Sequence, residues 1–104
     1  MYKNIDNVEW YAVEDGFIVK FQKDGIETKV EYDVTGSRSN ILRSYDESHM
    51  PFEIRDIIKT QYYDYNILVV YEIEHTHGIT YIVKVMDKTS IKVLQLTDGE
   101  MKVL

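Results

Sequence analysis

His75 and His77 are the residues whose types and spacing most directly suggest chemistry. They stand two positions apart in the segment EHTHGITY, residues 74–81. Two strand residues at i and i+2 point to the same face, so the two imidazoles could share a metal ion. A zinc or copper site would need further ligands, and the two preceding glutamates fall on the opposite face if the alternation continues. Because Gly78 follows directly, we expect a turn here, and the alternative is a metal site.

Nucleophilic and acid/base catalysis find little support in the sequence. Ser48 stands beside His49, but adjacent residues seldom place a serine hydroxyl against an imidazole, and no Gly-x-Ser-x-Gly motif exists. The carboxylates of Glu27, Glu31 and Asp33 occupy the polar face of an expected strand, where solvated charge is usual. The five glycines are isolated and form no phosphate-binding loop. We therefore predict a protein that is not an enzyme and holds no cofactor.

The composition narrows the class of protein further. The chain has 104 residues, enough for one domain spanning 1–104 with a modest core. It has no cysteine, which excludes disulfides and thiolate chemistry. Its 12 basic and 18 acidic residues give a net charge of −6, which disfavours nucleic acid and anionic membranes as partners. No apolar run reaches the roughly 18 residues that a membrane-spanning helix needs.

The first ten residues, MYKNIDNVEW, lack the basic and then apolar organisation of a secretory signal. The sequence alone therefore fits either a cytoplasmic protein or the mature region of an exported one.

Chain reversals are expected at all five glycines. Three of them follow an aspartate, and Asp-Gly between alternating apolar stretches is a strong hairpin signal. The segments between the glycines alternate with period two, as half-buried strands do. In the first half we expect an antiparallel meander of four strands, near residues 8–13, 16–22, 25–34 and 40–45.

One segment breaks this alternation. From Ile54 onward, apolar residues recur at i, i+3, i+4 and i+8, which predicts a helix over about 51–62 with Pro51 at its first position. Strand patterns resume after it and continue to the end of the chain. The predicted fold class is thus α+β, with about eight strands in antiparallel meanders, four before and four after one helix that packs on one sheet face.

A weak internal repeat underlies the pattern. Gly16 and Gly78 lie 62 positions apart, and Gly36 and Gly99 lie 63 apart. This self-similarity suggests two copies of a helix-plus-meander unit, with the helix of the first copy missing or outside this chain.

The second meander carries apolar residues on both faces. The expected core face consists of Ile67, Val69, Tyr71, Ile73, Ile79, Tyr81, Val83 and Val85. The reverse face holds Leu68, Val70, Ile82, Met86 and Leu94, with Leu96 if no bulge intervenes. One short helix covers only part of one face, so we expect another cover, whether a dimer partner, a missing helix or a bound protein. The alternative is a bulge near Val93 and Leu94 that returns the last two leucines to the core.

The open face would provide the contacts if the chain binds through it. The expected contact residues are Tyr11, Leu68, Val70, Ile82 and Met86. One alternative is a structural subunit that pairs with itself as a homodimer. Another is a protein that binds a metal or a small ligand at His75 and His77.

Several short motifs carry a family resemblance. Met50-Pro51 opens the expected helix, and Ile54, Ile58 and Tyr62 follow it. Aromatic-x-Val-x-apolar segments occur at Tyr81-x-Val83-x-Val85 and Phe17-x-Val19-x-Phe21, and a Tyr-Asp-x-x-Gly hairpin runs from Tyr32 to Gly36. From Val8 to Leu104 the chain resembles the PepSY-like, beta-lactamase-inhibitor-protein-like (BLIP-like) family of small exported bacterial domains. It departs from the pattern in Met50, where leucine is usual, and in the absence of a first helix.

The resemblance implies an exported α+β domain in the periplasm or the secreted fraction. Members of the family are generally of unknown biochemical role. The architecture is similar to inhibitors that grip a protein partner with a concave sheet face, which implies a non-catalytic module that binds a protein or peptide.

Overall fold

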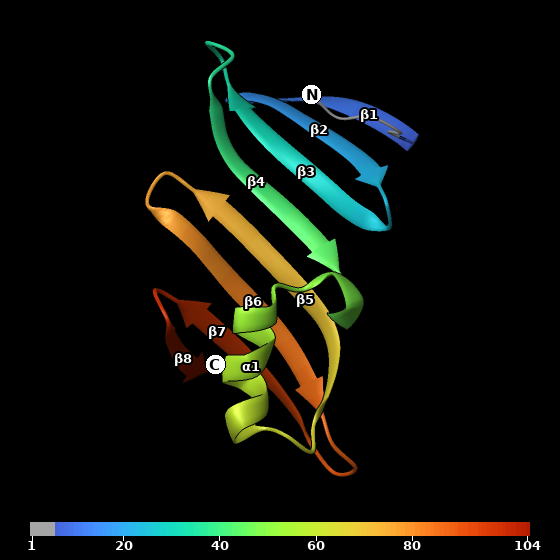
Figure 1. Cartoon of the computed structure of the whole chain (residues 1–104). Helices are drawn as coiled ribbons and strands as arrows, with labels where there is room; N and C mark the ends of the chain where they lie inside the picture. The colour runs from blue at the N-terminus through green and yellow to red at the C-terminus, as the bar shows by residue number, and fades with distance from the viewer. Residues whose placement is uncertain (1–5) are drawn as a thin grey trace.

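A computed structural model describes residues 6–104 as one open sheet of eight antiparallel strands, arranged in the order of the sequence, with one helix on one face (Figure 1). The strands are β1 (Asp6–Val13), β2 (Gly16–Lys23), β3 (Ile26–Asp33), β4 (Arg38–Tyr45), β5 (Asn66–His75), β6 (Gly78–Met86), β7 (Ile91–Thr97) and β8 (Glu100–Val103). A short 3-10 helix, η1 (Glu47–His49), and the helix α1 (Phe52–Gln61) connect β4 to β5. The predicted α+β meander with a central helix is confirmed. No helix in residues 6–104 combines the length and the apolar character needed to span a membrane.

The hairpins turn at the predicted glycines. Asp24 and Gly25 both have positive φ, at 53° and 80°, and Asp98 and Gly99 repeat this at 53° and 78°. Two successive positive φ angles are the requirement of the type I′ turn, whose twist matches that of the flanking strands. Asp-Gly therefore fixes the β2–β3 and β7–β8 hairpins.

Helix α1 lies within the predicted range and begins one residue later than expected. Pro51 is its N-cap, and Phe52 is the first helical residue. The backbone N–H of Tyr62 donates a 2.8 Å hydrogen bond to the carbonyl of Ile58 and closes the last turn. Ile58 is completely buried against the sheet.

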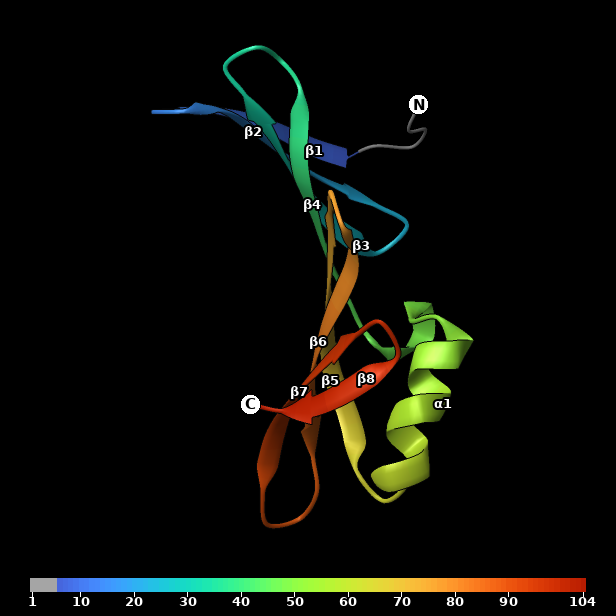
Figure 2. The ribbon, with the colours of Figure 1, turned by 90° about the vertical axis from the view of Figure 1, so that its left-hand side faces the viewer.

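The core divides into two clusters along the helix side of the sheet. The main cluster lies between α1 and the second half of the sheet and consists of Tyr45, Met50, Ile58, Ile67, Val70, Val83, Val85, Leu94 and Leu96. A smaller cluster on β2, β3 and β4 consists of Val19, Phe21, Val30 and Ile41. In the described part of the chain, α1 stands beside β5–β8 and no helix stands beside the first half (Figure 2). The interpretation as a tandem unit without its first helix stays a prediction.

A β-bulge in β5 changes which side chains of this strand face α1, contrary to part of the prediction. Ile67 lies opposite Val85, but the register shifts before Val69, so that Val70 lies opposite Val83. One extra residue reverses the alternation of everything that follows it. The prediction that Val70 lies on the open face is wrong, because its side chain is completely buried under α1.

The same bulge turns three expected core residues outward. Val69, Tyr71 and Ile73 lie opposite Lys84, Ile82 and Thr80, on the face away from α1.

Leu94 and Leu96 also face the helix, contrary to their expected position on the reverse face. They lie opposite Val83 and Tyr81, and both are buried. The β6–β7 register runs without a shift, so the alternative bulge near Val93 is absent from this pair of strands. The number of residues in the β6–β7 turn therefore determines which β7 side chains face α1.

Candidate functional site

On the helix-free face of β4–β7, apolar side chains surround Lys84, and we call these apolar side chains the open patch. Cross-strand pairing places Leu42 beside Ile73, Tyr71 beside Ile82 and Met86 beside Ile91. The open patch consists of Leu42, Val69, Tyr71, Ile73, Ile82, Met86, Ile91 and Val93. Because α1 lies on the opposite side of these strands, no described helix covers it (Figure 2).

Partial exposure distinguishes the open patch from the core. Tyr71 is 37% exposed and Ile91 is 59% exposed, and the other members are half-buried by their neighbours on the sheet. The strands beneath are hydrogen-bonded on both sides, so the patch is a preformed surface. An exposed apolar surface of this kind is typical of an interaction site.

Two of the predicted contact residues, Ile82 and Met86, belong to the open patch, and Leu68 lies beside it. Leu68 is the extra residue of the bulge and is 40% exposed. Val70 is excluded by its burial. Tyr71 and Ile73 were missed, because both faces of β5 are apolar and the bulge leaves no sign in the sequence.

Tyr11 faces the same side as the open patch but at the far end of the sheet. It lies opposite Ile18 on the edge strand β1, is 43% exposed and donates a hydrogen bond to Glu9. The ammonium of Lys20 lies 5.4 Å from its ring centroid. Five strand steps, about 24 Å across the strands at about 4.8 Å each, separate Tyr11 from Ile82, and the pairing offsets the two residues along the strands as well. The two residues share a face without sharing a contact area.

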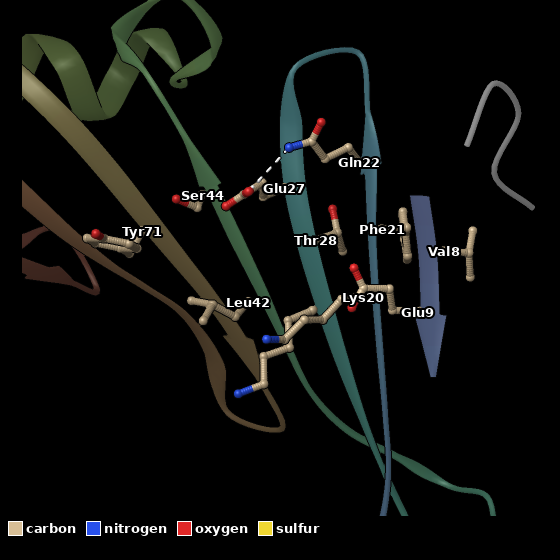
Figure 3. Close-up of a pocket in the computed structure, with 11 residues that line it drawn as sticks. Val8, Glu9, Lys20, Phe21, Gln22, Glu27, Thr28, Leu42, Ser44 and Tyr71 are labelled. Atoms are coloured by element: carbon tan, nitrogen blue, oxygen red, sulfur yellow. Dashed lines mark hydrogen bonds between the residues drawn. The ribbon is translucent and has the colours of Figure 1, made fainter. Parts of the chain in front are cut away.

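An open hollow of about 670 Å³ connects these two ends of the helix-free face (Figure 3). Leu42 and Tyr71 line one side of the hollow, and Val8 lines the other. Its charged residues are Glu9, Lys20, Glu27 and Lys29, two of each sign. Gln22 also donates a 3.2 Å hydrogen bond to Glu27. The hollow therefore shows no net preference for either charge.

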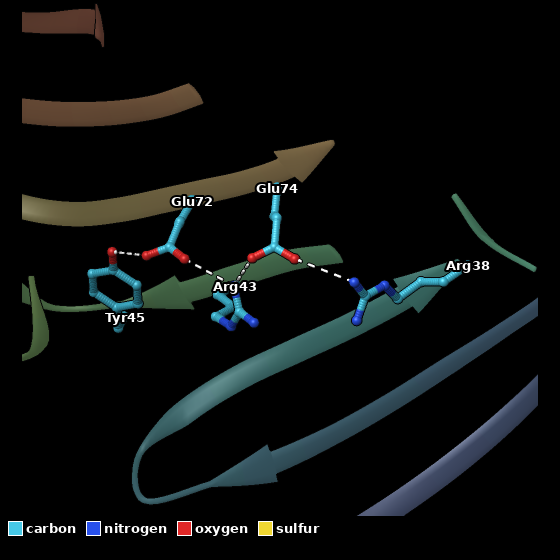
Figure 4. Close-up of polar contacts among 5 residues, drawn as sticks. All are labelled: Arg38, Arg43, Tyr45, Glu72 and Glu74. Carbon is cyan, nitrogen blue, oxygen red and sulfur yellow. Dashed lines mark hydrogen bonds and ion pairs between the residues drawn. The ribbon is translucent and has the colours of Figure 1, made fainter. Parts of the chain in front are cut away.

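The carboxylates of β5 face the helix side, where they form an ion network (Figure 4). Glu72 Oε2 accepts a 2.8 Å hydrogen bond from Arg43 Nη1, and Glu72 Oε1 accepts a 2.7 Å bond from the hydroxyl of Tyr45. Glu74 lies 3.5 Å from Arg43 and 3.7 Å from Arg38. Burial, and then the hydrogen bond to Glu72, raise the pKa of Tyr45. The network joins β4 to β5 between the two core clusters, so its role is structural.

The histidine pair lies in a turn, as expected. β5 ends at His75, and β6 begins at Gly78. The backbone N–H of His77 lies 3.2 Å from His75 Nδ1, and His75 Nε2 lies 3.2 Å from the hydroxyl of Thr80. Among the side chains of residues 8–104, no three histidines or carboxylates gather in a way that could hold a metal. The pair therefore gains no third ligand from the described residues.

Ser48 and His49 belong to a local cap. Asp46 accepts hydrogen bonds from the backbone N–H and the hydroxyl of Ser48, and these bonds lower the pKa of Asp46. The Ser48 hydroxyl lies 3.1 Å from His49 Nδ1. Because the hydroxyl hydrogen bonds to Asp46, these residues stabilise the start of η1 and do not form a catalytic serine.

No protein-family model matches the sequence, and the search of curated proteins finds no match. Solved structures match the fold over nearly the whole chain. A BLIP-like protein from Bacteroides fragilis gives a TM-score of 0.72 at 16% identity, over 99% of this chain and 78% of that one. A DUF2874 family protein from Bacteroides uniformis gives 0.71 at 16% identity, over 99% and 81%.

A third similar structure comes from Bacteroides eggerthii, and its name provisionally assigns it to the periplasm. Its TM-score is 0.69 at 11% identity, over 99% of this chain and 81% of that one. None of the three names describes an enzyme. The part of the predicted resemblance that concerns PepSY proteins stays a prediction. At these identities the likeness concerns architecture, and the conclusion is that this chain has the BLIP-like fold.

Proposed function

We propose that this protein is a non-catalytic module that acts outside the cytoplasm and binds a protein or peptide through the open patch. The observation that carries the proposal is the group of apolar side chains on β4–β7, on the face that α1 does not cover. Removing apolar surface from water contributes about 25 cal/mol per Å². A partner that covers the patch would supply this stabilisation.

The hydrogen-bonded strands beneath the open patch make this surface suited to binding a partner. Each side chain projects from a strand with a neighbour on both sides, so little conformational freedom is left to lose on association. Tyr71 lies near its centre, and tyrosine is enriched among the residues that dominate binding energy. The BLIP-like fold of the similar structures supports binding by analogy of architecture, and the periplasmic name of the Bacteroides eggerthii protein supports the location.

The test is a selection of random peptides on the immobilised chain, followed by affinity measurement by fluorescence anisotropy. The variant Ile82→Asp/Met86→Asp places two charges in the open patch, and Phe52→Asp places one on the exposed side of α1, where Phe52 is 72% exposed. We expect the patch variant to lose at least about tenfold in affinity, about 1.4 kcal/mol, with an unchanged circular dichroism spectrum. The Phe52 variant should bind as the parent does. Equal loss in both variants, or no loss in the patch variant, would reject the proposal.

Light scattering on the purified chain separates this function from the structural alternative. A monomer leaves the open patch available to another molecule. A stable homodimer that Ile82→Asp/Met86→Asp dissociates would assign the patch to self-assembly instead.

A further inference from the structure

We infer that the partner of the open patch is an acidic protein or peptide segment, with carboxylates next to an apolar side chain. The inference rests on the proposed function and concerns the partner's chemistry. Its first support is the uneven distribution of charge over the molecule. The chain as a whole has 18 acidic residues and a net charge of −6. On the helix-free face, however, the strands β4–β7 carry no carboxylate, and Lys84 is their one lysine or arginine.

The bulge in β5 contributes to this uneven distribution. Downstream of it, Tyr71 and Ile73 face outward, while Glu72 and Glu74 face the helix side. There the two glutamates are engaged by arginines on β4. Without the extra residue, the alternation would direct both carboxylates into the open patch.

Lys84 lies within the patch, between Val69 and Val93, and Lys29 and Lys102 border it. Lys102 on β8 lies opposite Gln95, which itself lies opposite Ile82. Lys84 and Lys102 are both exposed. The ion pairs formed among the side chains of residues 8–104 involve neither lysine. Both ammonium groups are therefore available to carboxylates of a partner.

Carboxylates reappear only at the limits of this surface. Glu27 on β3 lies opposite Ser44, and Glu100 at the β7–β8 turn lies opposite Thr97. Between them lie the apolar side chains of the open patch, with Lys84 among them and Lys102 beside them. A partner that places an apolar side chain against Ile82 brings its neighbouring residues over Lys84 and Lys102. Complementary charge in and beside such a patch speeds association and excludes partners of the wrong sign.

A second copy of this chain is a poorer occupant. Two chains of net charge −6 repel each other, and a symmetric contact through the same patch would bring lysines of one copy close to those of the other. An acidic segment also meets the net negative charge of the chain, but it brings no lysines against Lys84 and Lys102.

The test uses the same selection from an unbiased random-peptide library and reads the composition of the binders. We expect selected peptides to be enriched in Asp and Glu beside apolar residues, and to bind more weakly as salt is raised. Lys84→Glu/Lys102→Glu should weaken the best peptide at least about tenfold. Lys88→Glu, in the exposed β6–β7 turn, should change its affinity less than about twofold.

The variants keep this inference separate from the proposed function. Neutral or basic binders, or binders indifferent to Lys84→Glu/Lys102→Glu, would overturn the acidic partner. If Ile82→Asp/Met86→Asp still abolished their binding, the proposed function would stand. Binders indifferent to both variants, or a selection that yields no binder, would count against both. A stable homodimer would overturn the inference by making a second copy the occupant.

Discussion

The hydroxyl of Tyr45 donates a 2.7 Å hydrogen bond to Glu72, whose other carboxylate oxygen accepts a 2.8 Å bond from Arg43. Tyr45 is 5% exposed and belongs to the main core cluster, so this polar group sits at the edge of the apolar interior. The bond joins the last strand of the first meander to the first strand of the second.

Replacing Tyr45 with phenylalanine tests the contribution of this bond. A hydrogen bond to a charged acceptor is worth about 1.5–3 kcal/mol, so Tyr45→Phe should lower the free energy of unfolding by about that amount. Urea denaturation followed by circular dichroism measures it. Tyr63→Phe is the matched control, because Tyr63 is 78% exposed, and it should change stability by less than about 0.5 kcal/mol. Equal effects in the two variants would contradict the assignment.

Ile58 anchors α1 to the sheet. Its side chain is completely buried, so Ile58→Ala should cost about 2–5 kcal/mol through lost burial and a residual cavity. Phe52→Ala removes a larger side chain from the same helix, but one that is 72% exposed, and should cost less than about 0.5 kcal/mol. Thermal unfolding of the two variants measures the difference, and a larger loss in the Phe52 variant would show that the helix packs through another face.

Substitutions of Val70 and Ile82 test which side chains the bulge directs toward α1. Val70→Asp buries a charge among the core residues and should prevent folding or destabilise it by more than about 3 kcal/mol. Ile82→Asp, on the helix-free face, should fold with a smaller loss. Circular dichroism and urea denaturation compare them. A folded Val70 variant beside an unfolded Ile82 variant would restore the facing expected from simple alternation.

Gly16 and Gly78 correspond to each other in the internal repeat that the sequence suggests, and both have positive φ, yet their surroundings differ. A Cβ at Gly16 would collide with the carbonyl oxygen of Tyr32, whereas nothing lies within 4 Å of one at Gly78. Gly78→Ala should cost about 1–3 kcal/mol of backbone strain, and Gly16→Ala should cost clearly more. Urea denaturation measures both. Equal costs would mean that strain alone decides the effect.

The turn at Asp87 predicts a loss of stability in acid. Backbone N–H groups of Thr89 and Ser90 lower the pKa of Asp87 to about 2, from an ordinary value of 3.8. A carboxyl whose pKa is lowered in the folded state stabilises it above the unfolded pKa, and this contribution is lost as pH falls through the folded pKa. We therefore expect the free energy of unfolding to fall between about pH 4 and pH 2.

The variant Asp87→Asn keeps an accepting oxygen but removes the titration. Its urea midpoint should fall less steeply over the same pH range than that of the parent. Asp98→Asn, in the β7–β8 turn, removes the same charge elsewhere and is the control. An Asp87 variant as steep as the parent would contradict the role of this carboxyl. The residual slope is expected because hydrogen bonds to Thr35 and to Ser48 also lower the pKa of Asp33 and Asp46.

The architecture could be predicted because its signals are local. Glycine supplies the positive φ of each reversal, and the stripe from Ile54 to Tyr62 identifies the helix without any knowledge of its neighbours. These patterns follow from the geometry of a single element, so they survive tertiary packing.

The facing of the second half could not be predicted, because it depends on pairing. The bulge before Val69 is defined only against β6, and β5 is apolar on both faces, so either phase of its alternation buries apolar side chains. The number of residues in the preceding turn determines that Leu94 and Leu96 face the core. The alternation within β7 does not reveal this. For this reason simple alternation places Val70 outside and Tyr71 and Ile73 inside, opposite to their positions in the structure.

The strand order has a consequence for how the chain folds. Every strand hydrogen bonds only to strands that adjoin it in sequence, from β1 to β8, and no connection crosses the sheet. Closing each hairpin brings together residues separated by a short loop, except at the helical connection between β4 and β5, so the entropy of closure is lost in small steps. A chain with this connectivity has a low contact order for a protein rich in strands, and proteins with such topologies fold quickly.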